Sequence, residues 1–307
     1  MSDFIKIGES FHASIPSPGA AMKKLLENEN DTEAQNFLIS LVKSQAQGGA
    51  DYIAVNVDEF GQNAPELSVK LMEKYVEMVA KHGDGVPVCV DSSDDNVLIA
   101  GLKKWYQCGQ TTPPLINSVK TYNTDVIFPL LNDYKFKVIG LLISECQAGG
   151  PVQPEKLHQM AREIYDAAVK YGLTGDDIFF DTTVFPLAID MPMTPGQMGY
   201  TYCAFQAMKM ITNDPAMLGV HFSMGVTNCV KDLPARKIGV CRAYVQVART
   251  YGLDAGIVSI KNDYSGKEAD PELVKLVEAF AAQDGDLAKT QTAIELMANF
   301  CHSSKKK

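Results

Sequence analysis

The sequence has 307 residues, of which 46% are hydrophobic and 21% are charged, and its formal net charge at pH 7 is -9. This size and composition are typical of a globular protein with one large α/β domain or two small ones. The negative charge argues against a nucleic-acid partner, because phosphate binding needs a basic surface. No apolar run approaches the roughly 18 residues of a membrane helix, and no signal peptide is recognisable, so we expect a cytoplasmic protein without a membrane partner.

The cysteines and histidines give no sign of a disulfide framework or a metal site. The seven cysteines lack CxxC spacing, so we expect them to be small buried residues in a reducing compartment. The five histidines are scattered along the chain, and only His12 and His221 fall near the ends of predicted strands. Metal centres usually combine histidines with carboxylates, so we expect this chain to bind no metal.

Strand and helix patterns alternate along the chain almost without a break. Short apolar runs predict buried strands, and apolar residues at helical spacing predict helices. The predicted strands cover residues 4–8, 51–57, 86–90, 114–119, 136–143, 177–181, 216–222 and 256–260. The first strand is followed by a predicted loop that contains Pro16, Pro18 and Gly19. The predicted helices cover residues 32–47, 65–82, 95–104, 124–132, 154–171, a segment that ends near 212, 234–251, 271–283 and 286–300.

Eight strand–helix units with near-continuous apolar strands favour a parallel (β/α)8 barrel, the TIM barrel, with extra C-terminal helices. The alternative is a doubly wound sheet. That fold would need a GxGxxG turn after the first strand, and Gly8-Glu9-Ser10 does not supply one. No linker or low-complexity segment interrupts the pattern, so we expect a single domain over residues 1–307.

Polar side chains follow several predicted strands at their carboxyl ends, where parallel barrels carry their active sites. The clearest case is the stretch 86–104, in which a buried strand ends at Asp91 and a helix begins a few residues later. The full set of polar residues expected at the barrel mouth is Glu9, Asn56, Asp58, Asp91, Asn117, Glu145, Asp181, Asn228, Lys261, Asn262 and Asp263.

This set of carboxylates and amides is suited to binding a flat heterocycle such as a pterin. A carboxylate accepts two parallel N–H bonds from an amidine-like edge, and an Asn side chain offers a donor and an acceptor to a lactam edge. Each residue taken alone is explained equally well as a helix cap. Matching positions at several strand ends favour the binding site. We find no glycine-rich phosphate loop and no Cys or Ser nucleophile paired with a histidine.

An ordered set of motifs between about residues 5 and 260 carries a family resemblance. The motifs are Gly8-Glu9, Gly48-Gly49-Ala50-Asp51, Asn56-Val57-Asp58, Val90-Asp91-Ser92-Ser93, Ala100-Gly101-Leu102-Lys103, Ile116-Asn117-Ser118, Phe180-Asp181 and Phe185-Pro186. Together they resemble the pterin-binding family, which includes dihydropteroate synthase, the folate domain of cobalamin-dependent methionine synthase and the methyltetrahydrofolate:corrinoid methyltransferases. The corrinoid methyltransferases are the more similar branch, because the chain lacks the Arg-x-His of dihydropteroate synthase after its eighth strand.

This resemblance implies that Asp91, Asn117 and Asp181 hydrogen-bond the pterin ring, with Asp181 at the amidine edge and Asn56 in the same mouth. The reaction that it implies is methyl transfer, in either direction, between N5 of tetrahydrofolate and the cobalt of a corrinoid. The chain has no Asp-x-His-x-x-Gly cobalamin segment, so we expect the corrinoid (cobalamin) on a separate partner protein. The resemblance also implies a homodimer.

One motif departs from the family pattern. The Ser-Asn-Val-Ser run, whose Asn is placed to hydrogen-bond N5, is replaced here by the segment 221–228, with sequence HFSMGVTN. Either Asn228 or His221 is expected near N5, with Asp91 as the third catalytic candidate; alternatively, His221 is an ordinary strand residue and Asn228 a turn residue. Two other functions therefore stay open, a non-catalytic folate-binding or corrinoid-docking subunit and a dihydropteroate synthase.

Overall fold

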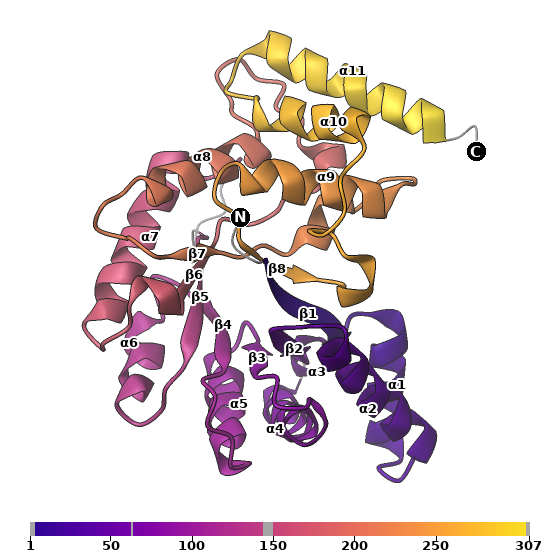
Figure 1. Ribbon diagram of the computed structural model, residues 1–307, viewed down its shortest axis with the longest axis vertical. Coiled ribbons are helices and arrows are strands. Elements are labelled where there is room, and N and C mark those ends of the chain that lie inside the picture. Colours follow the sequence, from indigo (N-terminus) through magenta and orange to yellow (C-terminus); the bar gives the residue numbers. More distant parts are fainter. Residues whose placement is uncertain (1–3, 63, 144–149, 305–307) are drawn as a thin grey trace.

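The computed structural model describes residues 4–62, 64–143 and 150–304. Eight parallel strands form one sheet in the order β7-β6-β5-β4-β3-β2-β1-β8, and helices alternate with them along the chain (Figure 1). The strands are β1 (Ile5–His12), β2 (Tyr52–Asn56), β3 (Val88–Asp91), β4 (Leu115–Val119), β5 (Lys137–Leu141), β6 (Ile178–Asp181), β7 (His221–Phe222) and β8 (Ala255–Val258).

The sheet curves into a nearly closed barrel whose seam lies between β7 and β8. At the seam the Ile257 amide donates a hydrogen bond to the Met224 carbonyl at 2.9 Å. Gly225 and Ile257 also form an isolated parallel bridge there. The predicted parallel (β/α)8 barrel is thus confirmed.

The helices cover the outside of the barrel, and two of them extend it at one edge. Helices α10 and α11 lie beyond α8 and α9, with α10 packed on both (Figure 1). The longer helices are α1 (Pro16–Glu27), α2 (Thr32–Gln47), α4 (Pro65–His82), α5 (Asp95–Gln107), α7 (Pro154–Val169), α8 (Tyr200–Thr212), α9 (Lys237–Arg249), α10 (Pro271–Ala281) and α11 (Leu287–Ser304). The short helical segments are α3 (Asp58–Gly61), α6 (Thr124–Ile127), η1 (Phe128–Asn132), η2 (Gly175–Asp177), η3 (Leu187–Ile189), η4 (Val226–Val230) and η5 (Ile260–Asn262).

A layer of apolar side chains fills the barrel interior and sets the position of the mouth. Its buried members are Ile7, Ala54, Cys89, Leu115, Ile139, Phe179 and Ala255. Side chains alternate between the two faces of a strand, so the residue two positions after each of these again points inward, one layer closer to the carboxyl ends. The intervening residues pack against the surrounding helices in a second, larger core.

The connection between β1 and α2 differs from the prediction. The expected loop with Pro16, Pro18 and Gly19 is wrong, because Pro16 is the first residue of α1. Proline is well tolerated in a first helical turn, where its missing N–H would have no helical partner. Strand β1 also runs past Gly8 to His12, with an irregularity in its pairing to β2 between Gly8 and Phe11.

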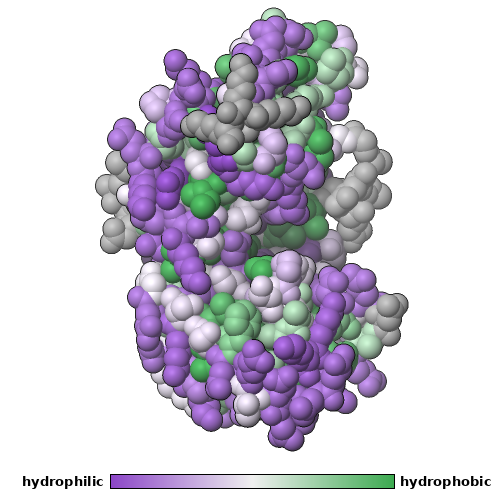
Figure 2. Space-filling view, turned by 90° about the vertical axis from the view of Figure 1, so that its right-hand side faces the viewer, coloured by the Kyte–Doolittle hydropathy of each residue, from purple (hydrophilic) through white to green (hydrophobic). Residues whose placement is uncertain are grey.

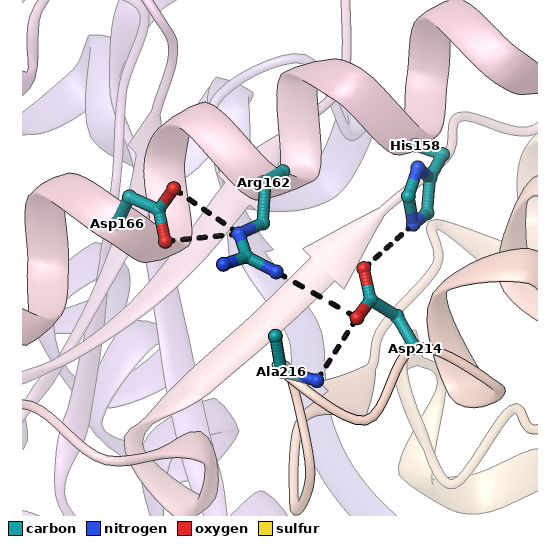
Figure 3. Close-up of polar contacts among 5 residues, drawn as sticks. All are labelled: His158, Arg162, Asp166, Asp214 and Ala216. Carbon is teal, nitrogen blue, oxygen red and sulfur yellow. Dashed lines mark hydrogen bonds and ion pairs between the residues drawn. The ribbon is translucent and has the colours of Figure 1, made fainter.

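A charged cluster on the outer surface joins α7 to the connection between α8 and β7 (Figure 3). His158 Nε2 lies 2.9 Å from Asp214 Oδ2, and Arg162 Nη1 lies 3.6 Å from Asp214 Oδ1. The Ala216 amide donates to the same carboxylate at 2.9 Å. These contacts hold the connection between α8 and β7 against α7.

Hydrophilic side chains cover most of the face shown in Figure 2, with only small hydrophobic patches between them. Within the described residues, none of the helices has the length and apolar character needed to cross a membrane.

Candidate functional site

Three polar residues lie side by side at the carboxyl ends of β2, β3 and β4. Asn56 pairs with Asp91, and Asp91 pairs with Asn117, in the strand register. Each follows an interior apolar residue by two positions, so all three side chains point into the barrel mouth. The Asn117 side-chain amide donates to Asp91 Oδ1 at 3.0 Å. The register of three neighbouring strands therefore places these groups on one level.

Asp181 adds a second carboxylate from another part of the barrel wall. It is the last residue of β6, two positions after the interior Phe179. Its Oδ1 accepts a hydrogen bond from the Thr183 amide at 2.7 Å.

These residues line one cavity of about 450 Å³ at the mouth, to which η4 contributes Asn228. A cavity of this size lies within the range of small-molecule sites. Its lining residues are Asn56, Asp58, Asp91, Ser92, Ser93, Asn117, Ser118, Lys120, Tyr122, Leu141, Ile143, Asp181, Thr183, Val184, Gly225, Asn228 and Ile257. The structure thus brings five of the six predicted site residues together.

Burial shifts the ionisation of both carboxyl groups. Burial raises the pKa of Asp181 to about 7, against the opposing effect of the Thr183 amide. The pKa of Asp91 also rises to about 7, mainly through burial, with the hydrogen bond from Asn56 opposing the rise and the charges of Asp58 and Asp181 adding to it. Removal of a carboxyl from water disfavours its charged form. Both groups are therefore able to exchange a proton near neutral pH.

Asp58 holds the loops that follow β2 and β3. Its carboxylate accepts hydrogen bonds from Ser92 Oγ at 2.5 Å, from the Ser93 amide at 2.8 Å and from Ser93 Oγ at 2.8 Å. Its own amide donates to Asn56 Oδ1 at 3.1 Å. Asp58 therefore fixes the orientation of the Asn56 side chain as well as the neighbouring loop.

A second cavity of about 470 Å³ adjoins the first and shares Asn56, Asp58 and Ser93 with it. His12 at the end of β1 lines this cavity and pairs with Asn56 in the strand register. Its Nδ1 accepts a hydrogen bond from the Ser14 amide at 3.1 Å, so the ring proton is on Nε2. Burial lowers the pKa of His12, which favours this neutral form.

The structure does not bring His221 into the group. His221 is the first residue of β7, and its pairing with Phe179 places it in the layer below the mouth. Its ring stacks on Phe179, and its Nδ1 lies 2.6 Å from Asp254 Oδ2, just before β8. The expected position of His221 near the mouth is thereby corrected. Its level is set by its partner on β6, because Phe179 belongs to the apolar interior layer.

Four other described residues that were expected at the mouth do not line the cavity. Glu9 accepts a hydrogen bond from Thr227 Oγ1 at 3.0 Å, and burial raises its pKa. Lys261, Asn262 and Asp263 follow β8 without lining the cavity. Glu145 lies outside the described residues. No group of three or more His, Cys, Asp or Glu side chains within the described ranges is arranged to hold a metal ion.

The sequence reasoning missed one residue of the cavity wall and gave another no role. His12 was expected near the strand ends, but it was not assigned to the site because the first strand was predicted to end at Gly8. Lys120 had a usable signal, because it directly follows the buried strand β4, but a lysine after a strand usually points to solvent. In the structure Lys120 is only 4% exposed and lines the cavity.

Comparisons with known proteins identify the family of the chain. Residues 27–259 match the family model described as pterin binding enzyme. The chain is also 26% identical over 261 residues to a protein of Eubacterium limosum named methylcorrinoid:tetrahydrofolate methyltransferase, an alignment that covers 83% of this chain and 84% of that protein.

Solved structures with the same fold include dihydropteroate synthases. The enzyme of Coxiella burnetii, in complex with pteroic acid, has a TM-score of 0.55 and 14% identity over 92% of this chain and 94% of its own. The enzyme of Clostridium difficile has a TM-score of 0.56 and 15% identity over 85% of this chain and 92% of its own. At this identity the structures establish the fold alone, whereas the family model spans most of the chain. The chain belongs to the pterin-binding enzyme family.

Proposed function

We propose that this protein is a methyltransferase that moves a methyl group between the cobalt of a corrinoid on a separate protein and N5 of tetrahydrofolate. The observation that carries the proposal is the cavity in which Asp91, Asn117 and Asp181 converge. The name of the Eubacterium limosum relative supports the substrates, and also the direction from methylcorrinoid to tetrahydrofolate. The corrinoid protein and the homodimer remain predictions.

In this proposal the pterin ring lies in the cavity with its N–H groups toward the carboxylates. Asp181 accepts the two parallel N–H bonds of the amidine edge, as a carboxylate does with a guanidinium. Asn117 offers its amide as donor and acceptor to the ring, and its bond to Asp91 fixes its orientation. The ring is thereby oriented with N5 accessible to a large partner from the open side of the mouth.

The transfer step needs a nucleophilic nitrogen and a place for its proton. The corrinoid supplies the methyl group and keeps the electron pair of the cobalt–carbon bond. The N5 lone pair forms the new bond to carbon, and N5 then loses its proton. In our proposal Asn228 hydrogen-bonds N5, and Asp91 accepts the released proton, which its pKa of about 7 makes possible near neutral pH.

The first test is calorimetric titration of the full-length protein with tetrahydrofolate, followed by addition of methylcobalamin while the absorbance of the corrinoid is recorded. Binding followed by formation of cob(I)alamin and methyltetrahydrofolate is the expected result. Binding without transfer, even with excess methylcobalamin, would favour a folate-binding or docking subunit. Condensation of a dihydropterin diphosphate with p-aminobenzoate would identify a dihydropteroate synthase instead. Absence of tetrahydrofolate binding would contradict the proposal.

A further inference from the structure

Lys120 occupies a fixed position in the wall of the mouth cavity. It follows the last residue of β4, and its backbone amide donates to Asn123 Oδ1 at 2.7 Å. The Asn123 side chain in turn donates to Asp95 Oδ1, in the first turn of α5, at 2.7 Å. The backbone at Lys120 is thus held by a bonded chain that reaches the next helix.

The side chain of Lys120 is mostly buried, and its ammonium group has no hydrogen-bond acceptor among the described residues. The side chain is 4% exposed, and its Nζ forms neither a hydrogen bond nor an ion pair within 4.0 Å in the described part of the chain. A ring contact exists, with Nζ 5.9 Å from the ring centroid of Tyr122. Partial removal of the ammonium from water lowers the pKa of Lys120, because it disfavours the charged form when no hydrogen bond compensates for the lost water. A ligand that placed an acceptor atom beside Nζ would remove this penalty.

The charges around the cavity indicate what kind of ligand would place an acceptor atom beside Lys120 Nζ. Among the described lining residues Lys120 is the single cation, and it faces a wall that carries Asp58, Asp91 and Asp181. Carboxylates select N–H donors on a ligand, whereas an ammonium selects an oxygen or nitrogen acceptor. A pterin offers such an acceptor, the lactam oxygen at position 4, next to the N3–H and 2-amino donors that carboxylates bind.

We propose that Lys120 is a substrate-binding residue that donates a hydrogen bond to the lactam oxygen of the pterin and so selects 4-oxo over 4-amino pteridines. The proposal rests on the proposed pterin function of the cavity. A 4-amino group would point N–H donors at the ammonium, leaving Nζ unpaired and adding a repulsive contact. Lys120 would therefore determine specificity at one atom of the ring.

The test compares tetrahydrofolate with tetrahydroaminopterin, which differ in the 4-substituent and in the proton on the adjacent N3, by calorimetry on the full-length protein. In Lys120→Met the affinity for tetrahydrofolate should fall by about tenfold or more, the effect of losing a charged hydrogen bond, whereas the affinity for tetrahydroaminopterin should change much less. Lys103→Met, which removes an exposed lysine from α5, is the matched control and should leave both affinities unchanged.

An unchanged preference between the two ligands in Lys120→Met would overturn the proposal. Equal weakening of both ligands would also overturn it, because Lys120 would then contact a part that they share, such as the glutamate tail. Failure of the wild-type protein to bind either ligand would instead contradict the proposed function. Thermal unfolding without ligand checks the fold of each variant. Lys120→Gln, measured in parallel, keeps a neutral donor and should retain part of the preference even if the Met variant does not fold.

Discussion

At the scale of single residues, the two mouth carboxyls are held in a state that disfavours their charge. Asp91 and Asp181 have pKa values of about 7 against an ordinary value of 3.8, chiefly because of burial. Between these two pH values the folded chain binds more protons than the unfolded chain. The contribution of both groups to stability therefore decreases as the pH rises from about 4 to about 7. Ligand N–H groups that pair with the carboxylates would offset this loss.

Asp181→Asn should separate the pH-dependent loss of stability caused by the Asp181 carboxyl from the effects of other titrating groups. An amide does not ionise, so without ligand the unfolding temperature of the variant should rise relative to wild type between pH 5 and pH 8. Thermal unfolding followed by circular dichroism at the two pH values measures the difference. The same variant should bind tetrahydrofolate at least about tenfold more weakly at pH 8, because one carboxylate acceptor is lost. A pH-independent difference in unfolding temperature would contradict the assigned burial effect.

Asn228→Ala should affect transfer more than binding. In the proposed function its side chain contacts N5, one atom of a ring that other residues hold. We expect the rate of methyl transfer at saturating tetrahydrofolate to fall by about tenfold to a hundredfold, with the dissociation constant of tetrahydrofolate changed less than threefold. Asn213→Ala, at the exposed end of α8, serves as the control. An unchanged transfer rate in Asn228→Ala would remove this residue from the N5 chemistry.

At the scale of elements, a buried aspartate ties the long β6–α8 loop to the C-terminal helices. Asp190 is 1% exposed, and its carboxylate accepts the Tyr200 and Thr201 amides at 2.8 and 2.9 Å, at the start of α8. Gln283, after α10, donates to the Asp190 carbonyl at 3.0 Å and accepts the Gly199 amide at 2.8 Å. The extra helices thus support a loop that leads to the mouth.

Asp190→Ala should lower the free energy of unfolding by about 2–3 kcal/mol, because it leaves the buried Thr201 amide and the partly buried Tyr200 amide unpaired. The control is Asp31→Ala, which removes the N-cap of α2. Asp31 is less buried and accepts a single bond, from the Ala34 amide at 2.9 Å, so we expect a loss of about 1 kcal/mol. Urea unfolding of both variants gives the comparison. Equal losses would show that the buried cap contributes no more than an ordinary one.

The same scale explains which parts of the site were predictable from sequence. Asn56, Asp91, Asn117 and Asp181 each end a short apolar run, so the alternation of a strand and the geometry of a parallel barrel place them correctly. The seventh strand was harder to place. The apolar run 216–220 lies entirely before β7, with Met217 in a turn that is closed by the bond from its amide to the Asp214 carbonyl. An apolar run is consistent with either conformation, and only the pairing with β6 decides between them.

The positions of Lys120 and His12 in the structure depend on contacts that no local sequence pattern encodes. The burial of Lys120 follows from the curvature of the barrel, which surrounds the end of β4 with neighbouring loops. The pairing of β1 with β2 shifts by one residue between Gly8 and Phe11, and the strand continues from there to His12. The local apolar pattern stops at Gly8 and does not predict this continuation.

At the scale of the whole molecule, the seam between β7 and β8 is the least extensively paired junction of the described barrel. Strand β7 has two residues, and closure relies on Met224, Gly225 and Ile257. We expect the Ile257 amide to exchange with deuterium faster than the Val90 amide of β3, which lies between two fully paired strands. Exchange followed by mass spectrometry or NMR measures this, and equal protection would contradict it.

Residues on both sides of this seam line the mouth cavity, with Asn117 and Asp181 in the continuous wall and Gly225 and Ile257 at the seam. A ligand that touches both groups stabilises the closed barrel by its binding free energy. The coupling is reciprocal. The ligand raises the equilibrium constant for closure of the seam by some factor, and opening of the seam lowers the binding constant of the ligand by the same factor. Affinity for such a ligand is therefore set partly by the hydrogen bonds that close the seam between β7 and β8.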